Sequence, residues 1–313
     1  MNALGIAIAA AIVASVVSPA VRPAVGQGQV YRAPRWLKTN QPDLNGVWQA
    51  LNSANYDIRP HAARAAMEVE TSPGGVEVPA APLVAMGAIG GIPGGLGIVD
   101  GGEIPYQPWA AERQRENFSN ALKRDPEVRC FLPGVPRATY MPYPFQIVQT
   151  TSHIVIAYEY GNATRTVFME NHEEAPVDSW MGWSNGRWEG DTLVVDVTGF
   201  NDETWFDRSG NFHSDALHVV ERYTPISPNH LQYEATIVDP KVFTRQWKIS
   251  MPLYRRIERN AQIMQYGCAA FVEEFMNGHL RRQPWNRRWQ EDLGRRGGLL
   301  TIEVTRGLSR VDP

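Results

Sequence analysis

The sequence predicts a mainly β protein, an antiparallel β-barrel or strongly curled sheet of lipocalin-like form with a few short helices. From residue 144 onward, apolar and polar residues alternate, and turn residues recur at short intervals. The chain also carries 10 Trp, 11 Tyr and 10 Phe among its 313 residues, and such side chains are favoured in strands. Short connections predict antiparallel neighbours, and closure removes the exposed edges of a sheet with this many strands.

Each predicted element follows from its local pattern. Residues 43–49 form a turn that leads into a first strand. Residues 110–124 form a helix that ends before Asp125-Pro126, and a second helix covers 269–280. The other strands are predicted at 145–150, 153–160, 163–169, 180–184, 187–189, 192–197, 216–224, 231–238, 243–251 and 261–266.

Composition and domain layout describe an ordinary folded protein without affinity for nucleic acid. Lys and Arg total 30 against 33 Asp and Glu, so a net charge of −3 offers no field that attracts phosphate backbones.

We expect one β-rich domain over 43–280, after an exposed lead-in over 27–42. Its Gly- and Pro-rich loop 73–102 is predicted to be a loop wrapped over the body or a lid across a pocket mouth, with a disordered insertion as the alternative. The basic tail 281–313 is solvated or binds an anionic surface.

Residues 1–26 are predicted to be a signal peptide. The apolar stretch over 3–17 is shorter than the about 20 residues that a membrane span needs, and small residues suited to cleavage follow it. No Lys or Arg precedes the stretch, so a retained membrane anchor or a mis-assigned start codon is the alternative. We therefore expect a periplasmic or secreted protein, without stable membrane insertion after cleavage.

The chain has 2 cysteines, Cys130 and Cys268. In an oxidising compartment such a pair is usually bonded, which predicts a disulfide. A nucleophilic or metal-binding thiol is the alternative, but the sequence has no CxxC motif and no Cys–His cluster.

Strand parity places charges inside the predicted barrel. Alternate residues share one face of a strand, so Glu221 and Tyr223 lie on the apolar face of one strand. Arg245 and Trp247 lie on the apolar face of another. Because an unpaired buried charge is costly, Glu221 and Arg245 either form a structural pair across the lumen or bind a ligand. We expect Arg245, Trp247 and Tyr223 to contact a substrate.

Two long connections, 170–179 and 199–214, hold further candidates, since long loops in compact domains are often functional. They share one barrel mouth if the chain reverses between them only once, and Glu189-Gly190-Asp191 is the favoured reversal. His213 is the predicted acid or base, because histidine titrates near neutral pH; a solvated or core-capping histidine is the alternative.

Other side chains would complete such a site. Asp207 or Glu221 would orient His213, while Trp183, Trp188 and Trp205 would pack against the substrate. We expect no metal, because a spacing of five places His213 and His218 on opposite faces of a strand. We also expect no cofactor, since nucleotide-binding and calcium-binding motifs are missing.

One hydrolase-like motif occurs, because residues 182–186 satisfy G-x-S-x-G around Ser184. A serine esterase needs that serine on a strand-to-helix elbow, whereas a strand-like segment follows here. A hairpin around Asn185-Gly186 explains the glycines more simply.

Several short motifs together resemble a known protein group. They are Arg129-Cys130 with Gly134-Val135-Pro136-Arg137, Gly186-Arg187-Trp188-Glu189-Gly190-Asp191-Thr192-Leu193-Val194-Val195, Gly199-Phe200-Asn201-Asp202, His213-Ser214 and Glu221-Arg222. Over roughly residues 43–280 the chain is similar to exported bacterial proteins that are common in soil lineages. The resemblance implies export and a β-rich body, and it assigns no activity.

We therefore expect an exported enzyme that binds a small, partly apolar substrate in a barrel pocket. It would act by His and carboxylate acid–base chemistry, as an isomerase, lyase, cyclase or hydrolase. A non-catalytic, lipocalin-like carrier of a hydrophobic ligand is the alternative, and a surface-binding module built on the basic tail is a third.

Overall fold

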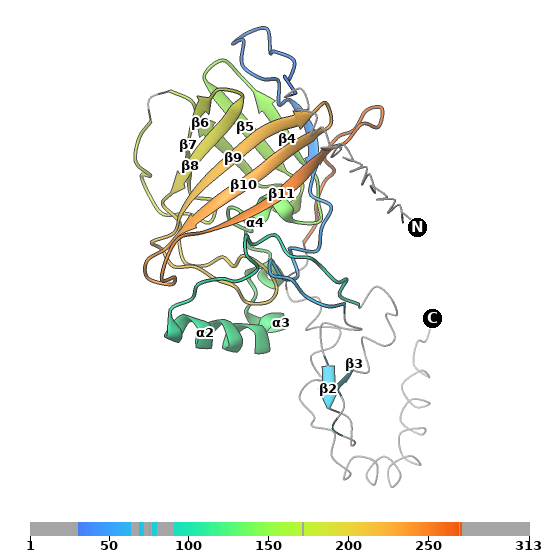
Figure 1. Ribbon diagram of the computed structural model, residues 1–313, viewed down its shortest axis with the longest axis vertical. Coiled ribbons are helices and arrows are strands. Elements are labelled where there is room, and N and C mark those ends of the chain that lie inside the picture. The colour runs from blue at the N-terminus through green and yellow to red at the C-terminus, as the bar shows by residue number, and fades with distance from the viewer. Residues whose placement is uncertain are drawn as a thin grey trace, which may run out of the picture. The chain divides into compact units, whose positions relative to one another are not determined.

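Nine strands close into a barrel, which confirms the predicted mainly β fold with few short helices (Figure 1). The computed structural model describes residues 31–63, 69–71, 75, 77–79, 91–170, 172–268 and 270. Around the barrel the strand order is β1-β11-β10-β9-β8-β7-β6-β5-β4. The bounds are β1 Gly46–Gln49, β4 Phe145–Gln149, β5 His153–Tyr158, β6 Thr164–Phe168, β7 Trp183–Glu189, β8 Thr192–Thr198, β9 His218–Ser227, β10 His230–Val238 and β11 Trp247–Arg255. A separate sheet pairs β2 Val69–Thr71 with β3 Glu77–Pro79.

One pair of barrel strands departs from the antiparallel pattern. β6 and β7 run parallel, with Val167 beside Ser184 and Phe168 beside Asn185. The connection between them must therefore carry the chain from one end of the barrel back to the other. Part of it lies against β7, since His172 Nε2 donates a hydrogen bond to the carbonyl oxygen of Gly186 at 2.8 Å.

The predicted hairpin around Asn185-Gly186 is wrong. Both residues lie within β7, which joins the two strands predicted at 180–184 and 187–189. A Cβ on Gly186 would lie 2.5 Å from a Val167 methyl group, so close packing against β6 requires this glycine, and no turn does. The chain does reverse between Glu189 and Thr192, as predicted.

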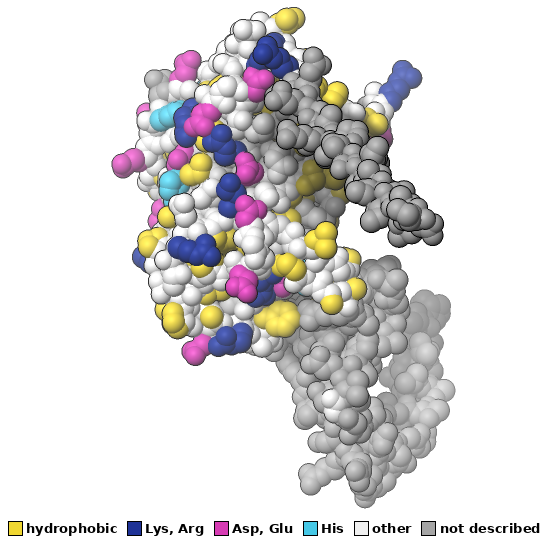
Figure 2. Space-filling model, in the orientation of Figure 1, with side chains coloured by type: hydrophobic (Ala, Val, Ile, Leu, Met, Phe, Trp, Pro, Cys, Tyr) yellow, Lys and Arg dark blue, Asp and Glu magenta, His cyan; other side chains and the backbone are white. Residues whose placement is uncertain are grey.

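Alternate side chains of the strands fill the barrel interior. Glu221 and Tyr223 of β9 are buried, as strand parity predicts, and Tyr233 of β10 lies opposite Tyr223. The outer face of β9–β11 carries paired charges instead, for example Lys248 Nζ at 3.1 Å from Glu234 Oε1. Figure 2 shows basic and acidic side chains interspersed over this wall, which leaves no extended patch of one sign there.

A cap covers one end of the barrel, and we define it as residues 50–63, 91–144 and 199–217. Its helices are α2 Pro108–Ser119, α3 Ala121–Arg124, η2 Pro126–Arg129 and α4 Arg137–Tyr140 (Figure 1). Pro108 at the first helical turn favours the start of α2. All four residues of α4 are buried, and the Tyr140 hydroxyl donates to the carbonyl oxygen of Phe206 at 2.8 Å. The 199–217 loop is thereby fixed against α4.

The predicted helix at 110–124 is present as α2 and α3, with a break at Asn120. No strand forms at 261–266.

The structure covers the loop 73–102 in part: Val99 forms an isolated bridge with Ile249 of β11, and Ser250 N donates to the carbonyl oxygen of Ile98 at 2.8 Å. This part of the loop therefore packs against the barrel wall.

Cys130 and Cys268 form the predicted disulfide. No helix of the described residues is long and apolar enough to cross a membrane. The predicted signal peptide at 1–26, nearly all of the predicted helix at 269–280 and the basic tail 281–313 lie outside the described residues.

Candidate functional site

His213 is enclosed in the cap with both ring nitrogens bonded. Its exposed fraction is 3%, and its ring lies 5.9 Å from that of Phe200 and 5.5 Å from that of Phe206. Nδ1 donates to the carbonyl oxygen of Ser214 at 2.8 Å, so in the neutral ring Nε2 accepts from the Thr204 hydroxyl at 2.6 Å. Burial lowers the pKa of His213, which favours this neutral form.

The other two predicted catalytic residues do not contact this histidine. Asp207 and Glu221 hydrogen-bond to other groups, and the first lies in the cap while the second lies in the barrel. The structure thus does not bring the predicted triad of His213, Asp207 and Glu221 together.

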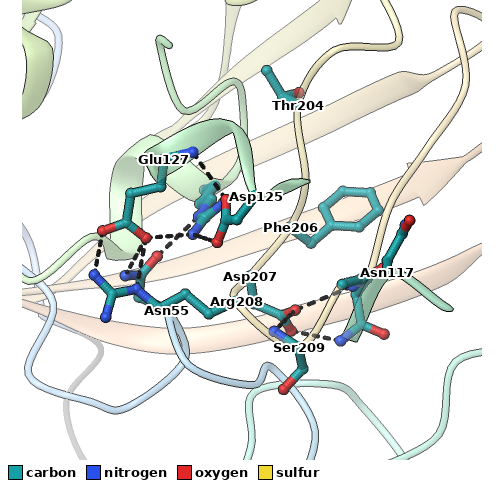
Figure 3. A network of polar contacts seen from close by, with 12 residues as sticks. Asn55, Asn117, Asp125, Glu127, Thr204, Phe206, Asp207, Arg208 and Ser209 are labelled. Atoms are coloured by element: carbon teal, nitrogen blue, oxygen red, sulfur yellow. Dashed lines mark hydrogen bonds and ion pairs between the residues drawn. The ribbon is translucent and has the colours of Figure 1, made fainter. Parts of the chain in front are cut away.

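Asp207 binds backbone and amide groups on two segments of the cap (Figure 3). Its carboxylate accepts from Ile58 N at 2.8 Å, from Ser209 N at 2.9 Å and from Asn211 Nδ2 at 2.6 Å. Burial, with a contribution from the charge of Asp57, raises the pKa of Asp207 to about 7. The side chain therefore joins residue 58 to the 207–211 turn and titrates close to neutral pH.

Glu221 has a buried cationic partner, but the prediction of Arg245 for that partner is wrong. Arg165 Nη1 lies 2.7 Å from Glu221 Oε2, and both side chains are nearly inaccessible. Arg245 is exposed, because β11 begins only at Trp247 and the preceding residues form a turn. Side chains alternate between the two faces only within a strand, so this alternation does not place Arg245 inside the barrel.

Two tyrosines complete the barrel cluster. The hydroxyls of Tyr223 and Tyr233 donate to Glu221 Oε1 at 2.9 and 2.7 Å. Burial raises the pKa of both tyrosines well above its ordinary value, so they remain donors. Arg165 was detectable in the sequence, since it alternates with Ala163 and Val167 on the inner face of the predicted strand 163–169.

The predicted aromatic residues do not line one pocket. By strand register Trp188 lies on the inner face of β7, whereas Trp183 lies on the outer face, where it stacks on Phe168 with ring centroids 4.7 Å apart. Trp247 packs inside against Phe206, and Trp205 lies in the cap in an isolated bridge with Phe212.

Ser184 of the G-x-S-x-G motif lies within β7, buried, where Arg165 Nη1 donates to its hydroxyl at 3.3 Å. No strand-to-helix elbow surrounds it, so the motif lacks the geometry of a serine esterase.

The two long connections meet, in agreement with the favoured single reversal at residues 189–191. Ser179 N donates to the carbonyl oxygen of Gly199 at 2.9 Å, and Asn201 N donates to that of Ser179 at 3.0 Å. This contact joins Ser179 to the beginning of the cap segment 199–217. The side chains that were expected to react are not gathered there.

A dense ion network in the cap has no counterpart in the sequence predictions (Figure 3). Arg137 binds Asp125 at 2.9 Å and Glu127 at 2.7 Å, with its guanidinium 2% exposed. Arg208 also binds Glu127, through Nε at 2.7 Å. Despite burial, these two cations lower the pKa of Glu127 to about 2, whereas burial raises the pKa of Asp125. No periodic pattern marks this non-repetitive segment, so sequence reasoning had no signal for it.

A cleft of about 550 Å³ lies between α2, residues 56–62, Ile92 and Ser209. Ser209 joins its walls, because its carbonyl oxygen accepts from Gln114 Nε2 at 2.6 Å and its hydroxyl donates to the carbonyl oxygen of Tyr56 at 2.8 Å. Asp57 and Arg59 line the cleft as a bidentate pair, with N–O distances of 3.0 and 3.1 Å. The cleft therefore combines apolar surface with an ion pair, and it lies in the cap rather than in the barrel lumen.

Among the residues that the structure describes, no three His, Cys, Asp or Glu side chains are grouped closely enough to hold a metal ion. No protein-family model matches the chain, and no curated protein is detectably similar to it. The cleft and the two buried ion clusters are the features of the described residues that bear on function.

Proposed function

We propose that this protein is an exported binding protein that carries a small, partly apolar molecule in the cap cleft. The observation that supports the proposal is the cleft itself, with a volume of about 550 Å³ and a lining that includes Ile92 and Phe118 beside charged groups. Ligand pockets usually measure about 300–1,000 Å³ and combine apolar walls with a few polar groups.

Two features support export. A disulfide is typical of proteins that fold in an oxidising compartment, and Cys130–Cys268 is one. The N-terminal apolar stretch has the length and the flanking small residues of a signal peptide. Both features support a periplasmic or secreted location.

The site favours binding over the His-based chemistry expected from the sequence. A general base must reach the proton that it removes, whereas His213 is enclosed and both of its ring nitrogens are occupied. Glu221 is likewise neutralised inside the barrel by Arg165. Neither residue lines the cleft.

Ligands that co-purify with the mature protein test this proposal. Ala62 lines the cleft and Ala63 does not, and both are exposed neighbours in the chain. Untargeted mass spectrometry should therefore detect a small molecule with wild-type protein and with Ala63→Trp, but not with Ala62→Trp, whose indole would occupy the cleft. Equal retention by both variants would refute the cleft as the binding site.

An enzyme is the second candidate, and the carboxylate of Asp57 at the cleft favours it. Asp57 lines the cleft, and behind it the pKa of Asp207 is raised to about 7. Asn211 Nδ2 links them, at 2.6 Å from Asp207 Oδ2 and 3.5 Å from Asp57 Oδ1. Asp57 can reach a bound ligand, whereas Asp207 is buried and does not line the cleft, so Asp57 is the group that would transfer a proton in an isomerase, lyase, cyclase or hydrolase.

Asp57→Asn separates the two candidates. If the protein is an enzyme, NMR of the compounds recovered from wild-type protein should show conversion by wild type, and none by the variant. If it is a carrier, neither protein converts them.

A further inference from the structure

The charges that line the cleft do not cancel. Asp57 and Arg59 neutralise each other through their bidentate contact. Arg115 of α2 also lines the cleft, and no described residue pairs with its guanidinium. The described lining therefore carries one uncompensated positive charge, which is also exposed to solvent.

His61 also lines the cleft. Its Nδ1 lies 2.9 Å from the carbonyl oxygen of Arg59, and its Nε2 lies 3.1 Å from that of Pro93. A carbonyl oxygen only accepts hydrogen bonds, so the ring nitrogen that carries the proton donates to one of these two oxygens.

An apolar surface lies next to the guanidinium. Arg115 and Phe118 are three residues apart on α2, and residues at this spacing lie on the same face of a helix. Phe118 and Ile92 both line the cleft. A ligand with an apolar body and an anionic end can thus contact both kinds of surface at once.

We propose that the cleft binds a small carboxylate, with the carboxylate on Arg115 and the apolar body on Phe118 and Ile92. A guanidinium offers two parallel N–H groups that match the two oxygens of a carboxylate. A phosphate dianion fits less well, because the described lining has one uncompensated positive charge, which balances one negative charge and not two. This inference rests on the proposed binding function.

Titration calorimetry of the full mature protein with phenylacetate, with its neutral amide phenylacetamide, and with inorganic phosphate tests the inference. Phenylacetate should bind about fivefold more tightly than the amide, as expected for one partly exposed charge contact. Arg115→Gln should abolish that preference. Arg113→Gln is the matched control, because this exposed α2 residue pairs with Glu116 and does not line the cleft.

The outcomes are distinguishable. If the amide binds as tightly as the acid and Ala62→Trp abolishes both, the carboxylate inference is wrong while the cleft remains the binding site. If phosphate binds more tightly than phenylacetate, the inference is also wrong. If none of the three probes binds, the carboxylate inference is wrong, and the comparison of ligands retained by Ala62→Trp and Ala63→Trp decides the cleft proposal. A fivefold preference that Arg115→Gln removes and Arg113→Gln keeps supports both.

Discussion

The barrel and the cap each bury charged side chains, but they do so in different ways. In the barrel one carboxylate, Glu221, is balanced by Arg165 and by two tyrosine hydroxyls. In the cap Arg137 lies between Asp125 and Glu127. The barrel cluster is a closed one-to-one pair, whereas the cap cluster spreads over η2, α4 and the loop that holds Arg208.

The difference concerns what each cluster holds together. Strands of the barrel are already joined by their ladders of backbone hydrogen bonds, so their pairing does not depend on the Glu221–Arg165 contact alone. Described segments of the cap are joined by isolated backbone hydrogen bonds, such as Arg208 N to the carbonyl oxygen of Asn55, and by side-chain contacts such as Arg208 with Glu127. We therefore expect removal of a buried charge to lower the free energy of unfolding more in the cap than in the barrel.

The largest effect is expected for Arg137→Leu. The substitution leaves two buried carboxylates without their shared cation, and loss of one partner of a buried pair typically costs about 3–5 kcal/mol. We expect the upper end of that range in the free energy of unfolding, measured with urea. Arg187→Leu, which breaks an exposed pair with Glu189, should cost less than about 1 kcal/mol. Similar losses for both variants would contradict a supporting role of the cap network.

A smaller loss is expected for Arg165→Leu in the barrel. Glu221 keeps two tyrosine donors, so we expect the lower end of the same range, about 3 kcal/mol. The double variant Arg165→Met with Glu221→Gln should recover most of that loss, since it leaves no unpaired charge in the interior. Urea unfolding of the single and double variants measures this, and equal stabilities would show that the pair itself stabilises the barrel.

The smallest effect is a change in how stability varies with pH. Burial lowers the pKa of His213, so the folded ring is neutral while the unfolded chain takes up a proton below about pH 6.5. This contribution to stability is present above that pH and is lost as the pH falls, by at most about 1.4 kcal/mol per pH unit.

Asp207 acts in the opposite direction. Its pKa of about 7 lies above the ordinary value of 3.8, so between these values the folded chain holds a proton that the unfolded chain has lost. Stability from this group falls as the pH rises from about 4 to about 7. In urea unfolding between pH 5 and 8, His213→Asn should lower the increase of stability with pH and Asp207→Asn should raise it. A change of the same sign in both variants would contradict the two assignments.

Period-two patterning predicted most of the barrel strands and the inward direction of Glu221, because alternation reflects local backbone geometry. The partner of Glu221 could not be predicted in the same way. Arg165 and Glu221 lie on β6 and β9, and which side chains meet across a lumen depends on strand order and stagger. The inward direction predicted for Arg245 is wrong because the start of a strand is the least certain part of such a prediction.

The cleft could not be predicted at all. Its lining comes from α2, residues 56–62, Ile92 and Ser209, which are far apart in the chain and, apart from α2, lie in segments without helical or strand periodicity. Gly186 shows a related difficulty. An Asn-Gly pair is a strong turn signal, and only the close approach of Val167 shows why the glycine lies within a strand.

The disulfide encloses every barrel strand except β1, although β1 lies between β11 and β4 in the strand order. Cys130 precedes β4 and Cys268 follows β11, so the bridge closes a covalent ring of chain that contains β4 to β11. A protease cut in any hairpin inside this ring leaves the fragments joined in one molecule. β1 enters from outside the ring and pairs through only two residues with β11 and three with β4. A cut between β1 and Cys130 would therefore leave the closing strand attached by non-covalent contacts alone.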